Sequence, residues 1–183
     1  SAASDVYKRQ GGVPEGYYEI PLGEPDVKRE GKDITILTIG ATLYRALEAA
    51  KTLEEKYGMS AEVIDARSLV PFNYEKVLAS VKKTGRIVIA GDATARGSFL
   101  NDLARNITEL AFDYLDAPAV VLGSRDWITP AYELEYAFFP QPDSFLDIIH
   151  EKIVPLQGYV PTRNYTDAEQ IRRAKEGLSL IHI

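Results

Sequence analysis

Residues 34–40, Ile34-Thr35-Ile36-Leu37-Thr38-Ile39-Gly40, decide the fold class of this chain. Apart from two threonines, every residue before the glycine is a branched apolar one. A strand buried on both faces of a parallel sheet has such a nearly continuous apolar run, whereas in a strand with one solvent-exposed face apolar and polar residues alternate. The run therefore predicts a central strand, ended by Gly40, in a sheet with helices on both sides.

The rest of the chain alternates between helical and strand patterns. Apolar residues recur at helical spacing after Gly40, with Thr42 placed to cap this helix and Gly58 to end it. The other expected strands are 61–64, 86–90, 119–123 and an edge strand at 17–20, and the other helices begin near Asn73, near Phe99 and at Pro142, with Gly85 closing the second. Such an order predicts a three-layer α/β/α domain with a mainly parallel five-stranded sheet.

The length of 183 residues, 45% of them hydrophobic, fits one domain with one core. We expect that domain to cover residues 11–153, followed over 154–177 by a surface strap and a charged peripheral helix. Residues 1–10 and 178–183 lack periodicity and resemble translated sequencing-adaptor peptides at the ends of environmental gene fragments. They are expected to be non-native tails of a truncated reading frame, so His182 is set aside.

Composition narrows the classes of function. The chain has 21 basic and 27 acidic residues and a formal charge of -6, which argues against binding nucleic acid or an anionic membrane surface. It has no cysteine, which excludes disulfides, thiolate metal sites and cysteine nucleophiles and agrees with a cytoplasmic location. No apolar run approaches the ~20 residues of a spanning helix.

The sequence offers no catalytic, cofactor-binding or metal-binding residue that we can assign. Neither the phosphate-binding pattern G-x-x-x-x-G-K-[ST] nor the dinucleotide pattern G-x-G-x-x-G occurs. Ser98 follows a glycine but lacks the second glycine of a hydrolase elbow. His150 lies in an apolar helix, where we expect it to interact with the carboxyl end of that helix rather than to act as an acid or base.

Sheets of this kind bind ligands at the carboxyl ends of their strands, so the loops there are the first candidates for a site, and they supply the candidate interface residues. Asp65 and Arg67 are expected either to hold a partner's backbone or to form a local ion pair that fixes the turn. Asp92 and Arg96 are expected either to line a contact between subunits or to lie in a solvated loop. Trp127 opens an aromatic stretch that is either a docking surface or a loop covering the core. The other rings of this stretch are Tyr132, Tyr136, Phe138 and Phe139.

Four motifs, in order, resemble one family. They are EGYYEIPLG at 15–23, VKREGKDITI at 27–36, AEVIDARSLVP at 61–71 and VKKTGR at 81–86. Together they are similar to the transketolase carboxy-terminal domain of beta subunits of thiamine-diphosphate-dependent 2-oxo acid dehydrogenases. The resemblance runs from about Gly11 to about Ile153.

The resemblance implies a role in oxidative decarboxylation of a 2-oxo acid as part of a larger complex. The alpha subunit holds the diphosphate and magnesium of thiamine diphosphate in such enzymes, and the amino-terminal half of the beta subunit holds the pyrimidine ring. This chain would then bind no cofactor and be inactive alone. Its role would be assembly with those two parts and docking of the acyltransferase core, and self-association is expected.

Departures from the family pattern leave the substrate open between pyruvate, a branched-chain 2-oxo acid, acetoin and others. Gly91-Asp92 replaces a histidine-glutamate pair, Gly97-Ser98-Phe99-Leu100 replaces G-G-x-G, and Asn73 replaces an acidic residue. The alternatives are the equivalent domain of a transketolase, of a deoxyxylulose-phosphate synthase or of a 2-oxo acid ferredoxin oxidoreductase, and a free-standing flavodoxin-like binding protein.

Overall fold

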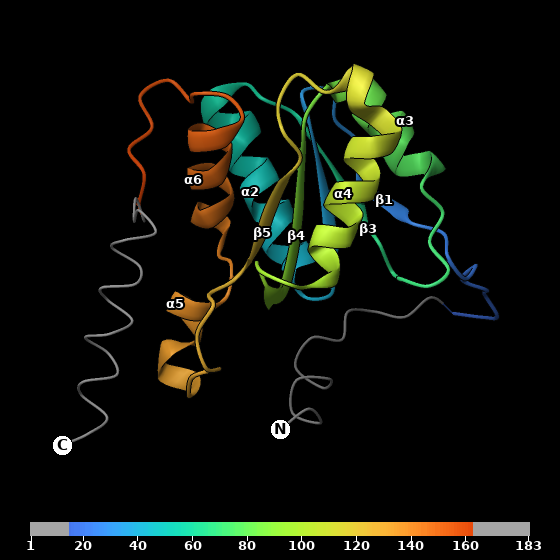
Figure 1. The fold of residues 1–183 in the computed structure, drawn as a ribbon, viewed down its shortest axis with the longest axis horizontal. Helices are drawn as coiled ribbons and strands as arrows, with labels where there is room; N and C mark the ends of the chain where they lie inside the picture. Colours follow the sequence, from blue (N-terminus) through green and yellow to red (C-terminus); the bar gives the residue numbers. More distant parts are fainter. Residues whose placement is uncertain (1–14, 163–183) are drawn as a thin grey trace.

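The structure, a computed structural model, describes residues 15–162 and contains one five-stranded sheet with helices on both faces (Figure 1). The strands are β1 (Asp26–Arg29), β2 (Ile34–Ile39), β3 (Ala61–Asp65), β4 (Ile87–Thr94) and β5 (Val120–Ser124). The helices are α2 (Thr42–Tyr57), α3 (Glu75–Thr84), α4 (Phe99–Ala111), α5 (Glu135–Phe138) and α6 (Pro142–Lys152), with 3-10 turns η1 (Phe112–Tyr114) and η2 (Tyr132–Leu134). The strand order is β1-β3-β2-β4-β5, and only β1 is antiparallel to its neighbour. The predicted fold class is confirmed.

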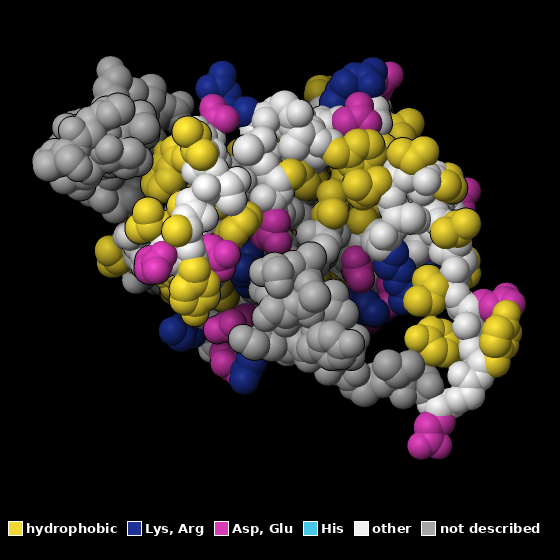
Figure 2. Space-filling view, turned by 90° about the horizontal axis from the view of Figure 1, so that it is seen from below, with side chains coloured by type: hydrophobic (Ala, Val, Ile, Leu, Met, Phe, Trp, Pro, Cys, Tyr) yellow, Lys and Arg dark blue, Asp and Glu magenta, His cyan; other side chains and the backbone are white. Residues whose placement is uncertain are grey.

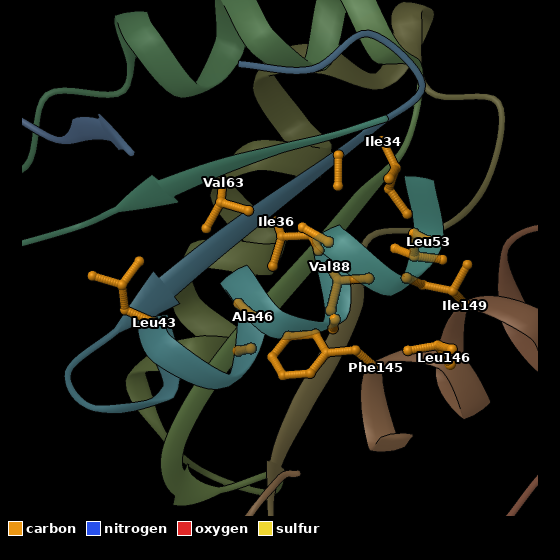
Figure 3. Close-up of a cluster of buried hydrophobic side chains, with 14 of the residues drawn as sticks. Ile34, Ile36, Leu43, Ala46, Leu53, Val63, Val88, Phe145, Leu146 and Ile149 are labelled. Carbon is orange, nitrogen blue, oxygen red and sulfur yellow. The ribbon is translucent and has the colours of Figure 1, made fainter. Parts of the chain in front are cut away.

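Helices α2 and α6 cover one face of the sheet. Strand β2 sends Ile34 and Ile36 to this face, and α6 brings Phe145, which is fully buried. Figure 3 shows the Phe145 ring extending from α6 toward Ala46 of α2 and Val88 of β4. Because side chains of a strand alternate between its two faces, the continuous apolar run of β2 serves this core and the opposite one together.

Helices α3 and α4 cover the other face, where β2 contributes Leu37 and the buried Thr35. The hydroxyl of Thr35 shares hydrogen bonds with Ser80 Oγ (2.6 Å) and Thr84 Oγ1 (2.8 Å) of α3. A buried hydroxyl costs little when it is hydrogen-bonded. Thr35 therefore fixes the position of α3 against the sheet without interrupting the core.

The predicted ends of the helices agree with the structure better than the predicted starts do. Both α2 and α3 end at the expected glycines, Gly58 and Gly85, each in the left-handed conformation. Thr42 does not cap α2; it is the first helical residue, and its hydroxyl bonds to β4 instead. Asn73 Oδ1 accepts a hydrogen bond from Glu75 N (2.9 Å), as a cap would, but Asn73 lies two positions before Glu75, the first residue of α3.

Two predicted strand boundaries were wrong. Residues 17–20 form no strand, and the edge strand is Asp26–Arg29. Residues 91–94 were expected in a loop, yet they extend β4 alongside β5 as far as the pair Thr94 and Ser124. Gly123 permits this extension, because a Cβ there would lie 2.5 Å from Ala93 O and 2.6 Å from Ala95 N.

The expected strap after α6 packs onto the domain. Leu156 is buried in the α2/α6 core, and its backbone N–H donates to His150 Nδ1 (2.9 Å) just beyond the end of α6. Tyr159 donates its hydroxyl to Asp147 Oδ1 (2.6 Å). The strap is therefore described over residues 154–162, while the expected peripheral helix and both tails lie outside the described residues.

Candidate functional site

The loops that follow β2, β3, β4 and β5 meet at one end of the sheet, because these four strands are parallel. We call this surface the strand-end face and define it by residues 40–45, 65–74, 91–98 and 124–139, with the segment 17–26 that packs on it. It is seen from below in Figure 2. Neighbouring strands β2 and β4 continue into α2 and α4 on opposite faces of the sheet. Ligands of α/β sheets bind in the crevice at such a point.

The side chain of Asp92 occupies the crevice between β2 and β4. Its Oδ1 accepts hydrogen bonds from Thr42 Oγ1 (2.8 Å) and from a guanidinium N–H of Arg45 (2.9 Å), both on the first turn of α2. The guanidinium of Arg45 also lies 5.9 Å from the ring centre of Phe139, a distance typical of a cation–π contact. These contacts tie the end of β4, the start of α2 and the aromatic stretch together.

Asp92 and Arg96 are not partners. The Arg96 guanidinium lies 3.5 Å from Asp126, and both side chains are mostly exposed. The alternative of a solvated loop therefore describes Arg96 but not Asp92, which is fixed by α2. Exposed ion pairs of the Arg96 kind contribute about 0–1 kcal/mol to stability, so this pair leaves both charges available to a partner.

Asp65 and Arg67 are brought together, although not as an ion pair. Asp65 Oδ1 accepts a hydrogen bond from the backbone N–H of Arg67 (3.1 Å), and Arg67 has a left-handed φ of 57°. The guanidinium of Arg67 pairs with Asp26 on β1. The predicted local ion pair was wrong, because the carboxylate fixes the turn while the cation reaches the edge strand.

The charge of Arg67 also acts on Asp26. Burial alone would raise the pKa of the Asp26 carboxyl, but the hydrogen bond from Lys28 and the positive charge of Arg67 outweigh this effect and hold the pKa below its usual range. Asp26 is consequently ionised at neutral pH. Asp26 thus forms ion pairs with both Lys28 and Arg67, and these pairs join β1 to the loop after β3.

The aromatic stretch divides into a buried part and an exposed part. Phe138 is buried and lies 4.8 Å from Phe139 and 6.5 Å from the ring of Trp127, which is 37% exposed. Ile128 and Tyr132 are 86% and 82% exposed. One end of the stretch therefore covers the core, and the other end presents apolar side chains outward.

Sequence reasoning missed a second exposed apolar group on the same face. Segment 17–26 is fastened to the loop after β3, since Gly23 N donates to Ser68 Oγ (2.6 Å) and Asn73 N donates to Gly23 O (2.8 Å). The residues that precede this attachment in the sequence expose four large side chains, those of Tyr17, Tyr18, Ile20 and Leu22. Figure 2 shows hydrophobic side chains along this segment at one side of the face and over α5 at the other. The signal was the four large apolar or aromatic residues within 17–22, of which residues 17–20 were assigned to a strand.

Two kinds of functional element are absent from the part of the chain that the structure describes, a group of metal ligands and a membrane-spanning helix. Within residues 15–162, no group of three or more histidine, cysteine, aspartate or glutamate side chains is arranged to hold a metal ion. Over the same residues, no helix is long and apolar enough to cross a membrane. The histidine of this region of the chain, His150, accepts its hydrogen bond from Leu156 on the strap, away from the strand-end loops.

The fold is that of an α/β domain with a mainly parallel five-stranded sheet. The sequence profile of the family described as Transketolase, C-terminal domain matches residues 23–145, and the chain belongs to this family. The resemblance inferred from the motifs is confirmed.

Similar proteins include beta subunits of several enzymes. The chain is 40% identical over 146 residues to the acetoin:2,6-dichlorophenolindophenol oxidoreductase subunit beta of Bacillus subtilis (79% of this chain, 42% of that protein). It is 37% identical over 135 residues to the pyruvate dehydrogenase E1 component subunit beta of the same species (74% and 41%). It is 42% identical over 131 residues to the 2-oxoisovalerate dehydrogenase subunit beta of Pseudomonas aeruginosa (71% and 36%).

The chain spans about two fifths of the length of these curated relatives. Among solved structures, one described as a split gene transketolase, an inactive beta4 tetramer, matches with a TM-score of 0.64 and 28% identity, over 80% of this chain and 48% of that one. The match supports the assignment of the fold.

Proposed function

We propose that this chain is the carboxy-terminal domain of the beta subunit of a thiamine-diphosphate-dependent 2-oxo acid dehydrogenase, and that it serves assembly rather than catalysis. Its strand-end face would contact the alpha subunit and the amino-terminal half of the beta subunit, and the domain would help to dock the acyltransferase core. The identity of 37–42% to beta subunits supports the parent enzyme. Relatives of acetoin, pyruvate and 2-oxoisovalerate enzymes match about equally, so the proposal names no single acid.

The observation that carries the proposed role is the way in which the strand-end face divides its polar and apolar groups. Three charged residues of this face, Asp26, Arg67 and Asp92, already have partners within the chain. A protein that covered the face would therefore remove few unpaired charges from water, which lowers the cost of binding. The groups left outward are large apolar ones such as Ile128 and Tyr132. Burying apolar area contributes roughly 25 cal/mol per Å², and aromatic side chains are enriched in protein interfaces.

The cofactor of the parent enzyme is thiamine diphosphate with magnesium, and the residues described here do not fit a site for it. A diphosphate–magnesium group needs free cations or backbone N–H groups and oxygen ligands for the metal. The crevice of this sheet instead contains the Asp92 carboxylate, and Arg45 is engaged with it. We therefore assign the cofactor to the alpha subunit and the amino-terminal half of the beta subunit. We also propose that the complex is cytoplasmic.

A chimera tests the proposed role. This chain would replace the matching carboxy-terminal part of the Bacillus subtilis acetoin oxidoreductase beta subunit, and the product would be co-expressed with its alpha subunit. We expect a complex that co-purifies. Ile128→Asp with Tyr132→Asp should abolish co-purification, because charges would be buried without partners. Val160→Asp is the matched control, since Val160 is equally exposed but lies on the strap.

Two results would contradict the proposal. A complex that tolerates the double variant as well as the control shows that the strand-end face is not the contact. Calorimetric titration of the isolated 183-residue chain with thiamine diphosphate and magnesium should give no binding heat, and micromolar affinity would place the cofactor on this chain.

A second candidate is the equivalent half of a split transketolase, which the structural neighbour favours. Its identity of 28% is below the values for the dehydrogenase beta subunits. A parallel chimera with that transketolase would separate the two candidates by which alpha-type partner it retains. The flavodoxin-like alternative stays a prediction that native mass spectrometry tests, since it requires a bound small molecule.

A further inference from the structure

The strap, residues 154–162, turns back along α6 and is held by three polar side chains of that helix (Figure 1). They are Asp143, Asp147 and His150, which the helical repeat places on one side of α6. None of the three belongs to the strand-end face. The attachment of the strap is therefore independent of the contacts of that face and of the function proposed for it.

The far end of the strap is held by two carboxylates. Asp147, only 7% exposed, accepts hydrogen bonds at Oδ1 from the Tyr159 hydroxyl (2.6 Å) and from the backbone N–H of Thr162 (2.9 Å). The Thr162 hydroxyl lies 3.0 Å from Asp147 Oδ2 and 3.2 Å from Asp143 Oδ2. The Tyr159 ring also packs edge-on against Tyr57 of α2, with 6.0 Å between the ring centres. Both carboxylates are therefore occupied by the strap.

The near end of the strap depends on the protonation state of one imidazole. The backbone N–H of Leu156 donates to His150 Nδ1 (2.9 Å), and the Leu156 side chain is buried in the α2/α6 core. A ring nitrogen accepts a hydrogen bond only when it carries no proton, so the proton of the neutral ring lies on Nε2. When His150 takes up a second proton, Nδ1 becomes a donor. The Leu156 N–H then loses its acceptor and faces another N–H.

Few charged or titratable groups face this imidazole. On α6, Asp147 lies one turn before His150, whereas the charged side chains of 151–152 are exposed. On the strap, the Tyr159 ring lies 5.4 Å from the imidazole, centre to centre, and Tyr57 of α2 lies behind it. A protonated imidazole would compete for the Asp147 carboxylate, to which Tyr159 is already bonded. Protonation therefore weakens the attachment at both ends of the strap.

We propose that protonation of His150 releases the strap from α6. Only the neutral ring accepts the Leu156 N–H, so the attachment is complete at high pH and is lost as the pH falls and the ring takes up a proton. The strap would thus respond to pH in the range where histidine side chains titrate. Release would uncover the part of the α2/α6 core that Leu156 and Tyr159 now cover.

Amide hydrogen exchange of the full 183-residue chain at pH 8 and pH 5.5, followed by mass spectrometry, tests the inference. Exchange rates are divided by those of an unstructured peptide at the same pH, so that only protection is compared. We expect the protection of residues 154–160, relative to that of β2, to fall about tenfold between the two pH values. At pH 5.5 about ten imidazoles in water are protonated for each neutral one, and only the neutral ring can hold the strap.

Two variants at position 150 separate protonation from packing. His150→Asn keeps an acceptor oxygen near the place of Nδ1 and does not titrate, so its strap should show less than about a twofold change between the two pH values. His150→Ala has no acceptor, and its strap should be poorly protected at both. Equal protection of the unmodified strap at pH 8 and pH 5.5, an equal fall in His150→Asn, or full protection in His150→Ala would each overturn the inference.

Discussion

Removing the charge of Lys83 should destabilise the domain through Glu62. The Glu62 side chain on β3 is only 5% exposed, and its Oε2 accepts hydrogen bonds from Lys83 Nζ and from the backbone N–H of Gly31 (3.3 Å). Breaking a buried ion pair costs about 3–5 kcal/mol. The Lys83 side chain is 43% exposed, so in a variant without this lysine water can take over part of its interaction with Glu62. We therefore expect Lys83→Met to lower the free energy of unfolding by about 1–3 kcal/mol at neutral pH.

The pH dependence of this loss gives a second test. Burial alone would raise the pKa of Glu62, but the hydrogen bonds from Lys83, Ser80 and Gly31 lower it below the usual range. A carboxyl with a lowered pKa in the folded state stabilises the fold above its unfolded pKa of about 4.3, and this contribution disappears as the pH falls through the folded pKa. The difference between Lys83→Met and the unmodified chain should therefore narrow in acid.

Urea unfolding at neutral pH and in acid measures both effects. Lys51→Met is the control, because the Lys51–Glu55 pair is exposed and should be worth less than about 0.5 kcal/mol. A neutral-pH loss no greater than that of the control, or a loss that stays constant into acid, would refute the reasoning about the buried carboxylate.

Two further variants test the packing. Phe145→Ala should lower the free energy of unfolding by about 3–5 kcal/mol, because it leaves a cavity between α6 and the sheet; a loss below about 1 kcal/mol would mean that α6 is not part of the core. Tyr159→Phe should cost about 1 kcal/mol by removing the hydrogen bond to Asp147. Burial and this hydrogen bond raise the pKa of Tyr159, so the stability that its neutral form provides is lost only above about pH 10. Ultraviolet titration of the unmodified chain should show a late-ionising tyrosine that is absent from Tyr159→Phe, and identical high-pH transitions in the two proteins would contradict this.

Local chemistry in the sequence predicted the central part of the fold. The run Ile34–Ile39 is a strand with the expected bounds, and Gly58 and Gly85 end their helices. These predictions succeeded because a strand buried on both faces and a left-handed helix end each depend on the residues at the position itself.

Features that depend on distant residues were missed. Strand β1 has one apolar residue, Val27, and is held by backbone pairing to β3 and by ion pairs. The sequence of such a strand has no alternation of apolar and polar residues from which the strand could be predicted. The partners of Arg67 and Asp92 lie 41 and 50 residues away along the chain. The sequence therefore identified candidate residues of the strand-end face but not the contacts that fix them.

Gly123 allows the end of β4 and the start of the aromatic stretch to lie close together on the strand-end face. A single added carbon at this position would collide with the backbone at Ala93 and Ala95. Gly123→Ala would push the end of β4, with Asp92, away from the stretch that begins at Trp127, while altering neither a core side chain nor an exposed one. An alanine at position 123 is therefore expected to shift the strand-end loops relative to one another, because the added carbon has no room beside the backbone of residues 93–95.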